Sequence, residues 1–174
     1  MNQSLAITAI GEDRPGIVNE LTEFLHNANL NIEDSRMSIL GGEFAIILLV
    51  SGDTAAIESV TLQKESLERS LNLNLLIKKT TSKAHSGQQI SYNINVEGMD
   101  NPGIVHKLTR YLSQHSINIV NMQTSSSHAA HTGTPVFTVN MRVDIPANKD
   151  LQQIQEGFSL LCDDLNMDAD FSPA

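Results

Sequence analysis

The sequence contains one eight-residue pattern twice, as GEDRPGIV at residues 11–18 and as GMDNPGIV at residues 98–105. Shifting the chain by 87 residues aligns residues 5–38 with 92–125, and 13 of these 34 positions are identical. Unrelated segments of this length would share about two positions, so the chain is an internal duplication. The fold of the whole chain therefore follows from the fold of one copy.

Each copy has the pattern of a βαββαβ unit. In the first copy the alternating stretch LAITAIG predicts a strand, and the apolar residues after Pro-Gly are spaced three and four apart, as in an amphipathic helix. Pro15 and Pro102 are expected in the first turn of that helix. A Gly-Gly hairpin between two strands follows, then a second helix capped by Asp53, then the strand LNLLIKKT. The second copy repeats this order, with helices expected near 103–116 and 149–165.

A βαββαβ unit of this length is expected to fold as a ferredoxin-like α+β sandwich, with one antiparallel sheet and helices on one face. The expected domains are residues 1–80 and 89–174. Residues 81–88 are polar and lack periodicity, so they are expected to be a linker. In this topology the second strand lies at a sheet edge, where it can pair with another unit, and we expect a homo-oligomer.

Composition narrows the classes of function. The 174 residues include 11 basic and 20 acidic side chains, a net charge of −9, which argues against direct binding of nucleic acid. The longest apolar run, FAIILLV, is far shorter than a membrane helix, and the N-terminus has no features of a secretory signal. A cytoplasmic protein without membrane partners is expected. Cys162 is the single cysteine and is interpreted as a buried apolar residue.

The repeated pattern has two interpretations. A strand that ends in Gly, followed by Asp, Pro-Gly and a helix start, directs backbone N–H groups at one point, which attracts a carboxylate. Asp13 could then accept hydrogen bonds from an ammonium group, and Asn31 offers both a donor and an acceptor, so the groups complement a free amino acid. In the alternative, Asp13 is only a helix cap, while Gly11 and Gly16 only allow a tight turn.

The segment DRPGIV, followed by NIEDSRM within a duplicated βαββαβ unit, resembles the ACT domain family of regulatory modules, which bind amino acids at interfaces between domains. The resemblance covers nearly the whole chain, and the first copy is most similar to tandem ACT regulators of glycine cleavage genes. It implies a non-enzymatic repressor that responds to a small amino acid, glycine above all. It also implies contact with a DNA-binding activator rather than with DNA. No cofactor and no metal are expected.

Carried over residue by residue, the ligand positions of the family fall on Gly11, Asp13 and Asn31 and, in the second copy, on Gly98, Asp100 and Asn118. The full candidate ligand-binding set adds their neighbours Arg14, Pro15, Gly16, Ile17, Ile32, Asn101, Pro102, Gly103, Ile104 and Ile119. The second copy departs from the family where Asn101 replaces Arg14 and NIVNMQ replaces NIEDSR. Its site is therefore expected to bind a different ligand or none.

Two other functions stay open at this point. ACT modules often accompany metabolic enzymes, so the chain could be an amino-acid-sensing regulatory subunit. His128 and His131 have a spacing that a metal site could use, but the segment SSSHAAHTGTP offers only hydroxyls beside them, which favours a surface loop. The charged run EDSR on the expected edge strand either discourages aggregation or selects a partner by charge.

Overall fold

The computed structural model describes residues 3–81, 88–128 and 133–174. The chain divides into two compact units, Met1–Ala84 and His85–Ala174, and each is described by itself below. Most of the linker expected at 81–88 and part of the histidine segment, including His131, lie outside the described residues.

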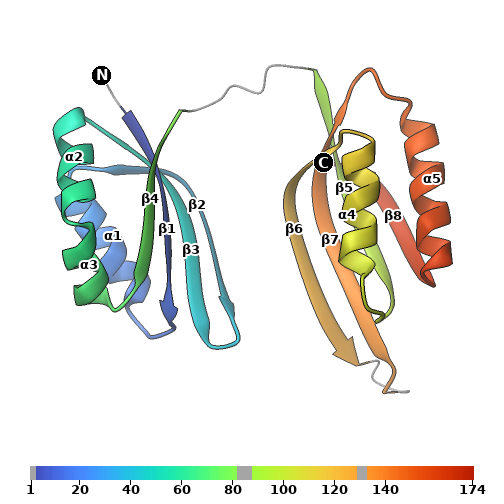
Figure 1. The fold of residues 1–174 in the computed structure, drawn as a ribbon, viewed down its shortest axis with the longest axis horizontal. Helices are drawn as coiled ribbons and strands as arrows, with labels where there is room; N and C mark the ends of the chain where they lie inside the picture. The colour runs from blue at the N-terminus through green and yellow to red at the C-terminus, as the bar shows by residue number, and fades with distance from the viewer. Residues whose placement is uncertain (1–2, 82–87, 129–132) are drawn as a thin grey trace. The chain divides into compact units, whose positions relative to one another are not determined.

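The first unit is a four-stranded antiparallel sheet with helices on one face (Figure 1). The sheet has the order β2-β3-β1-β4, so β2 lies at an edge as the sequence predicts. Its elements in chain order are β1 (Gln3–Glu12), α1 (Ile17–Asn27), β2 (Asn31–Leu40), β3 (Glu43–Gly52), α2 (Thr54–Leu62), α3 (Lys64–Leu71) and β4 (Asn74–Thr80).

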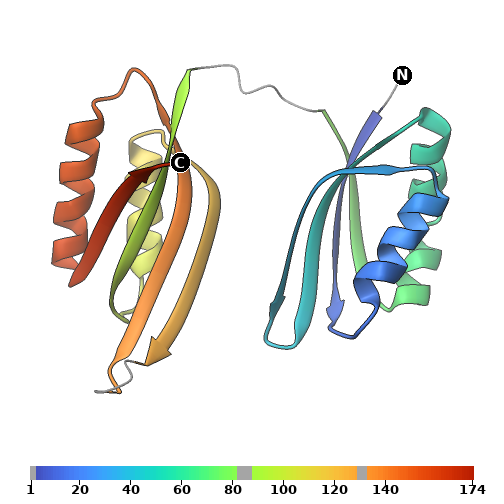
Figure 2. The same cartoon turned by 180° about the vertical axis from the view of Figure 1, so that it is seen from behind.

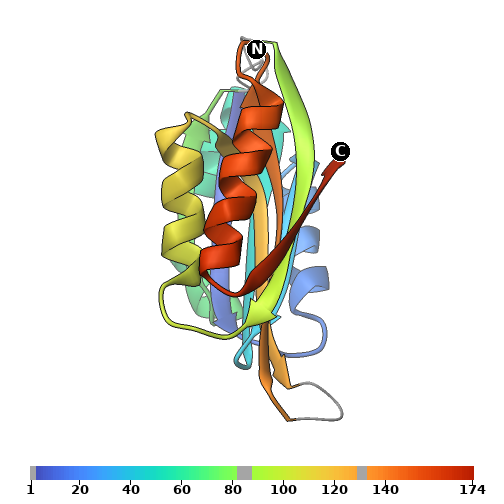
Figure 3. The same cartoon turned by 90° about the vertical axis from the view of Figure 1, so that its right-hand side faces the viewer.

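The second unit repeats this architecture, with sheet order β6-β7-β5-β8 and the edge strand β6. Figure 3 shows α4 and α5 lying along the same face of its sheet. Its elements are β5 (Gln89–Met99), α4 (Ile104–Gln114), β6 (Asn118–His128), β7 (Pro135–Pro146), α5 (Leu151–Asp164) and β8 (Met167–Pro173). The ferredoxin-like fold predicted for each copy is confirmed in both units.

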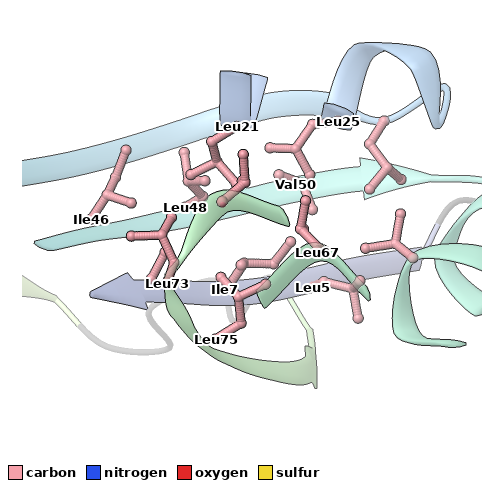
Figure 4. Packing of buried hydrophobic residues seen from close by; sticks show 14 of the residues in the cluster. Leu5, Ile7, Leu21, Leu25, Ile46, Leu48, Val50, Leu67, Leu73 and Leu75 are labelled. Atoms are coloured by element: carbon pink, nitrogen blue, oxygen red, sulfur yellow. The ribbon is translucent and has the colours of Figure 1, made fainter. Parts of the chain in front are cut away.

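The alternation of side chains along the strands separates a covered face from an open one. In β1, Leu5, Ile7 and Ala9 are buried against the helices, and the residues between them point to the other face. The buried stripe of α1, which includes Leu21 and Leu25, packs on this covered face (Figure 4). Burial of such side chains is worth about 1.5–3 kcal/mol each and holds each unit together.

Two local predictions differ from the structure. The second helix of the first copy is broken at Gln63 into α2 and α3, although the seven-residue spacing of Val60 and Leu67 is that of one continuous helix face. Helix α1 begins at Ile17 with Gly16 as its N-cap, so Pro15 precedes the cap and is not in the first turn. The predicted cap of α2 is confirmed, since the Asp53 carboxylate accepts a 2.7 Å hydrogen bond from an N–H of the first turn.

Candidate functional site

The first glycine of each repeated pattern has a structural task. A Cβ atom on Gly11 would lie 2.8 Å from the carbonyl oxygen of Asn72, and one on Gly98 would lie 2.5 Å from that of Asn166. Real Cβ atoms do not approach backbone oxygens so closely. These glycines therefore let the end of β1 or β5 pass close to the turn before the last strand.

The second glycine of each pattern starts the helix. Gly16 has φ +92° and Gly103 has φ +86°, in the left-handed region that favours glycine. Neither helix has a side chain that caps its first turn, so the interpretation of Asp13 as a cap is wrong. Ile17 and Ile104 are buried core residues, and the N–H of Ile17 already donates to the carbonyl oxygen of Arg14 at 3.3 Å.

The aspartates of the two patterns have different surroundings. The N–H of Asp13 donates to the carbonyl oxygen of Gly42 at 3.1 Å, which places the exposed Asp13 at the β2–β3 hairpin. Its carboxylate makes no hydrogen bond or ion pair with any residue that the structure describes. The Asp100 carboxylate instead accepts a 3.0 Å hydrogen bond from the Ser126 hydroxyl. Of the two, Asp13 is therefore the carboxylate that is open to a ligand.

Arg14 is engaged within its own loop. Its guanidinium donates two hydrogen bonds of 2.6 Å to Glu20, and these hydrogen bonds hold the pKa of the Glu20 carboxyl below its usual range. In the second copy the matched positions hold Asn101 and Lys107, and the Asn101 amide donates to the carbonyl oxygen of Met99 at 3.3 Å. The Arg14–Glu20 ion pair beside the first pattern therefore has no counterpart beside the second.

Asn31 does not lie beside Asp13 in the same unit. Gly11 is opposite Phe44 on β3 and Asn31 is opposite Ser51, seven residues further along that strand. At about 3.3 Å per residue the two ends are roughly 23 Å apart. Figure 2 shows the reason, since α1 carries the chain from the end of β1 back to the far end of the sheet, where β2 starts. Within one unit, Asp13 and Asn31 are therefore too far apart to hold one ammonium group together.

The surroundings of Asn31 include a carboxylate that the motif did not point to. Its amide donates a 2.9 Å hydrogen bond to Glu33, the residue at which β2 bulges out of register with β3. Glu33 also accepts a hydrogen bond from the Ser51 hydroxyl, and these two bonds lower the pKa of its carboxyl, with Ser51 as the larger cause. A bulge leaves no signal in the sequence pattern, so only the strand register could find this group.

Asn118 and Ile119 occupy the matched end of the second unit. Together with neighbouring residues they line an open hollow of about 420 Å³ between the end of α4 and the start of β6. The other lining residues are Thr109, Ser113, Ser116 and Ile117. Asp100 lies at the far end of this sheet, so the second copy separates its candidate residues in the same way as the first.

Other site classes find little support in the described residues. No group of three or more His, Cys, Asp or Glu side chains among them could hold a metal ion, and His131 is not one of them. The helices of the described segments are all too short or too polar to cross a membrane. Cys162 is buried as interpreted, and burial, with Asp163 and Asp168 nearby, raises the pKa of its thiol to about 11.

Comparison with known families and structures supports the duplicated fold. Two ACT domain models match the chain, one over residues 3–79 and the other over 86–159. The solved structure of a protein of unknown function from Galdieria sulphuraria is 30% identical and covers 100% of this chain and 99% of its own, with a TM-score of 0.86. A structure provisionally assigned as a glycine cleavage system transcriptional repressor is 29% identical over the same shares, with a TM-score of 0.75.

Among curated proteins, the glycine cleavage system transcriptional repressor of Escherichia coli is 34% identical over 164 residues. The match spans 93% of this chain and 85% of that protein, so it includes both units. Similarity of this extent, together with two ACT domain matches and the duplicated fold, indicates a regulatory protein. The chain is therefore a tandem ACT-domain protein and belongs to the family of the glycine cleavage system transcriptional repressor.

Proposed function

We propose that this chain is a non-enzymatic regulator that senses a small amino acid, glycine above all, and represses transcription of the glycine cleavage system. The observation that carries the proposal is the 34% identity over 93% of the chain to a protein named for that repression. The chain acts through contact with a DNA-binding activator. Its net charge of −9 supports this, because direct DNA binding requires basic side chains that neutralise phosphates.

The amino-acid site is formed by two copies of the chain. The hydrogen bond from Asp13 to Gly42 places Asp13 at the end of β2, whereas Asn31 is at its start. Antiparallel pairing of the exposed β2 edge with the same edge of a second copy would bring the start of one strand beside the end of the other. Asn31 of one copy would then face Asp13 of the other.

The groups at such a composite site suit a zwitterion. The Asp13 carboxylate accepts hydrogen bonds from the ammonium group, and the start of the eleven-residue helix α1 attracts the carboxylate. The Asn31 amide oxygen supplies a second acceptor, since its NH₂ group is already turned toward Glu33. Occupation of this site would stabilise one arrangement of copies and so change the surface offered to the activator.

Calorimetry with a panel of amino acids tests the site. Asp13→Ala is expected to weaken glycine binding at least about tenfold, because a hydrogen bond to a charged group is lost. The melting temperature should change little, since Asp13 caps no helix. The matched control is Asp100→Ala, whose carboxylate is already bonded to Ser126 and is expected to affect binding less. Unchanged glycine affinity in Asp13→Ala would refute the ligand site without touching the regulatory role.

A promoter-binding assay tests the regulatory step separately. The purified chain should not shift glycine-cleavage promoter DNA at physiological salt, but it should join a complex that also contains the activator. Tight, salt-sensitive binding of the chain alone to DNA would contradict the proposal. Co-purification with a metabolic enzyme in place of the activator would instead identify a regulatory subunit.

A further inference from the structure

The face of the first sheet that points away from α1, α2 and α3, which we call the open face, carries large apolar side chains between charged rims. Register and alternation place three large side chains on it, Ile10, Ile47 and Leu76, which are 45%, 51% and 67% exposed. Leu49 lies on the same face, two residues from Ile47 on the central strand β3. A contiguous exposed apolar surface on one sheet face is typical of an interaction site.

The second unit shows that this fold does not require an apolar open face. At the position matched to Ile47 it has Asn140, and at that matched to Leu76 it has Asp170. Asn95, matched to Thr8, donates a 2.9 Å hydrogen bond to Asn140. The second sheet thus has the polar open face that a solvated antiparallel sheet usually presents. The apolar face of the first sheet is therefore a property of that unit and not of the architecture.

We propose that the open face of the first sheet is an interface between two copies of this chain, packed sheet on sheet. The rims of the face carry charges that a second copy can pair, Lys78 on β4 and, on β2, Asp34, which within one copy forms an ion pair with its neighbour Arg36. Asp34 on β2 and Lys78 on β4 lie in one row of directly opposed residues, at opposite rims, with Leu49 and Ala6 between them. A two-fold axis parallel to the strands places β2 of one copy over β4 of the other and keeps each row over itself. Asp34 of each copy then meets Lys78 of its partner.

The size of the face sets the strength of this contact. Four strands about 4.8 Å apart and about eight residues long present roughly 500 Å² per copy. A pair of copies would bury roughly 1,000 Å² in total, at the lower limit for a specific interface. We therefore expect a weak dimer whose assembly depends on concentration. It uses side chains of the open face, so it goes beyond the edge pairing of the proposed function and leaves the β2 edge available.

Sedimentation velocity from about 1 to about 200 µM tests the proposal with a matched pair of variants. Ile47→Lys places a charge in the centre of the interface and is expected to raise the dimer dissociation constant at least about tenfold. Asn140→Lys makes the same change at the matched position of the second sheet and should leave it unchanged. Circular dichroism and melting of both variants check that they fold.

Charge reversal tests the orientation. Lys78→Glu and Asp34→Lys should each weaken the dimer, and both changes in one chain should restore it, because each copy then offers the opposite charges to its partner. A chain that stays monomeric at about 200 µM, or a dimer equally strong in Ile47→Lys, would overturn the proposal. Loss of dimerisation in Ser35→Pro, a variant in which the β2 edge is blocked, would also overturn the proposal. This proline also removes the hydrogen bond that the Ser35 N–H donates to the Asp34 carboxylate, so the Asp34→Lys variant shows how much of any loss comes from Asp34.

Binding of the activator to the open face is another possible result of these experiments. If Ile47→Lys abolished the complex with the activator while the unmodified chain remained monomeric, the activator would be the occupant of this face, and the dimer proposal would be wrong. If instead the dimer formed as expected but glycine binding failed, only the ligand site of the proposed function would be lost.

Discussion

The guanidinium of Arg14 donates two parallel hydrogen bonds of 2.6 Å to the carboxylate of Glu20 and so joins the β1–α1 loop to the first turns of α1. Both side chains are about 40% exposed, so solvent screens much of their attraction. Arg14 is one of the neighbouring residues that complete the candidate ligand-binding set. Arg14 therefore joins the loop to α1, and its contact with a ligand stays a prediction.

Replacement of Glu20 by Gln tests this pair through its acid dependence. The pKa of Glu20 is lowered in the folded chain, first by the hydrogen bond from Arg14, so its contribution to stability is present above the unfolded pKa near 4.5. It is lost as pH falls through the lower folded pKa. Glu20→Gln should therefore lower the melting temperature slightly near pH 7 and leave a smaller difference below pH 4. An equal difference at all pH values would contradict this role.

Gly11→Ala should destabilise the first unit. The added Cβ would lie 2.8 Å from the carbonyl oxygen of Asn72, and a backbone atom cannot move aside cheaply. Overpacking of this kind costs about 1–3 kcal/mol, measured by denaturant unfolding. Gly98→Ala, with a contact of 2.5 Å, should destabilise the second unit at least as much. Asp13→Ala is the control in the same loop, and a comparable loss there would show that the whole loop is fragile.

Gly157→Ala is a change in a helix interior that should destabilise the chain, although alanine normally favours a helix by about 1 kcal/mol over glycine. Its Cβ would lie 2.4 Å from the hydroxyl oxygen of Tyr111, which donates a 3.0 Å hydrogen bond to Ile154. The Tyr111 ring is also held by a stacked contact with His115. We expect a net loss of about 1–2 kcal/mol in denaturant unfolding.

A double-mutant cycle separates this clash from other causes. Tyr111→Phe removes the hydroxyl that the new Cβ would meet, so Gly157→Ala should cost much less in that background. The same cost in both backgrounds would show that the hydroxyl is not responsible.

Cys162 should report unfolding of the second unit. Its thiol is buried and its pKa is raised to about 11, so at pH 8 only about 0.1% is thiolate in the folded state. Reaction with a thiol reagent should be slow and should accelerate in step with unfolding by denaturant. Because the folded pKa is raised, this residue's contribution to stability is present below pH 9 and is lost as pH rises toward 11. Rapid reaction in native buffer would contradict the burial.

Much of the fold could be read from the sequence because local pattern determines it. The duplication, the βαββαβ order and the buried stripe of α1 follow from repetition and periodicity in the sequence, and Asp53 caps α2 as predicted. The break at Gln63 and the bulge at Glu33 could not be read, since both depend on how a segment fits against neighbours distant in the sequence.

The candidate site divides in the same way. The sequence by itself determined that each repeated pattern joins a strand to a helix, with Asp13 in the connection of the first copy. The tertiary structure decided that Asn31 lies at the other end of the sheet, because a helix that follows a strand carries the chain back to the end from which it came. It also decided which alternate residues of β3, Ile47 among them, form an open face, since that depends on the side the helices cover.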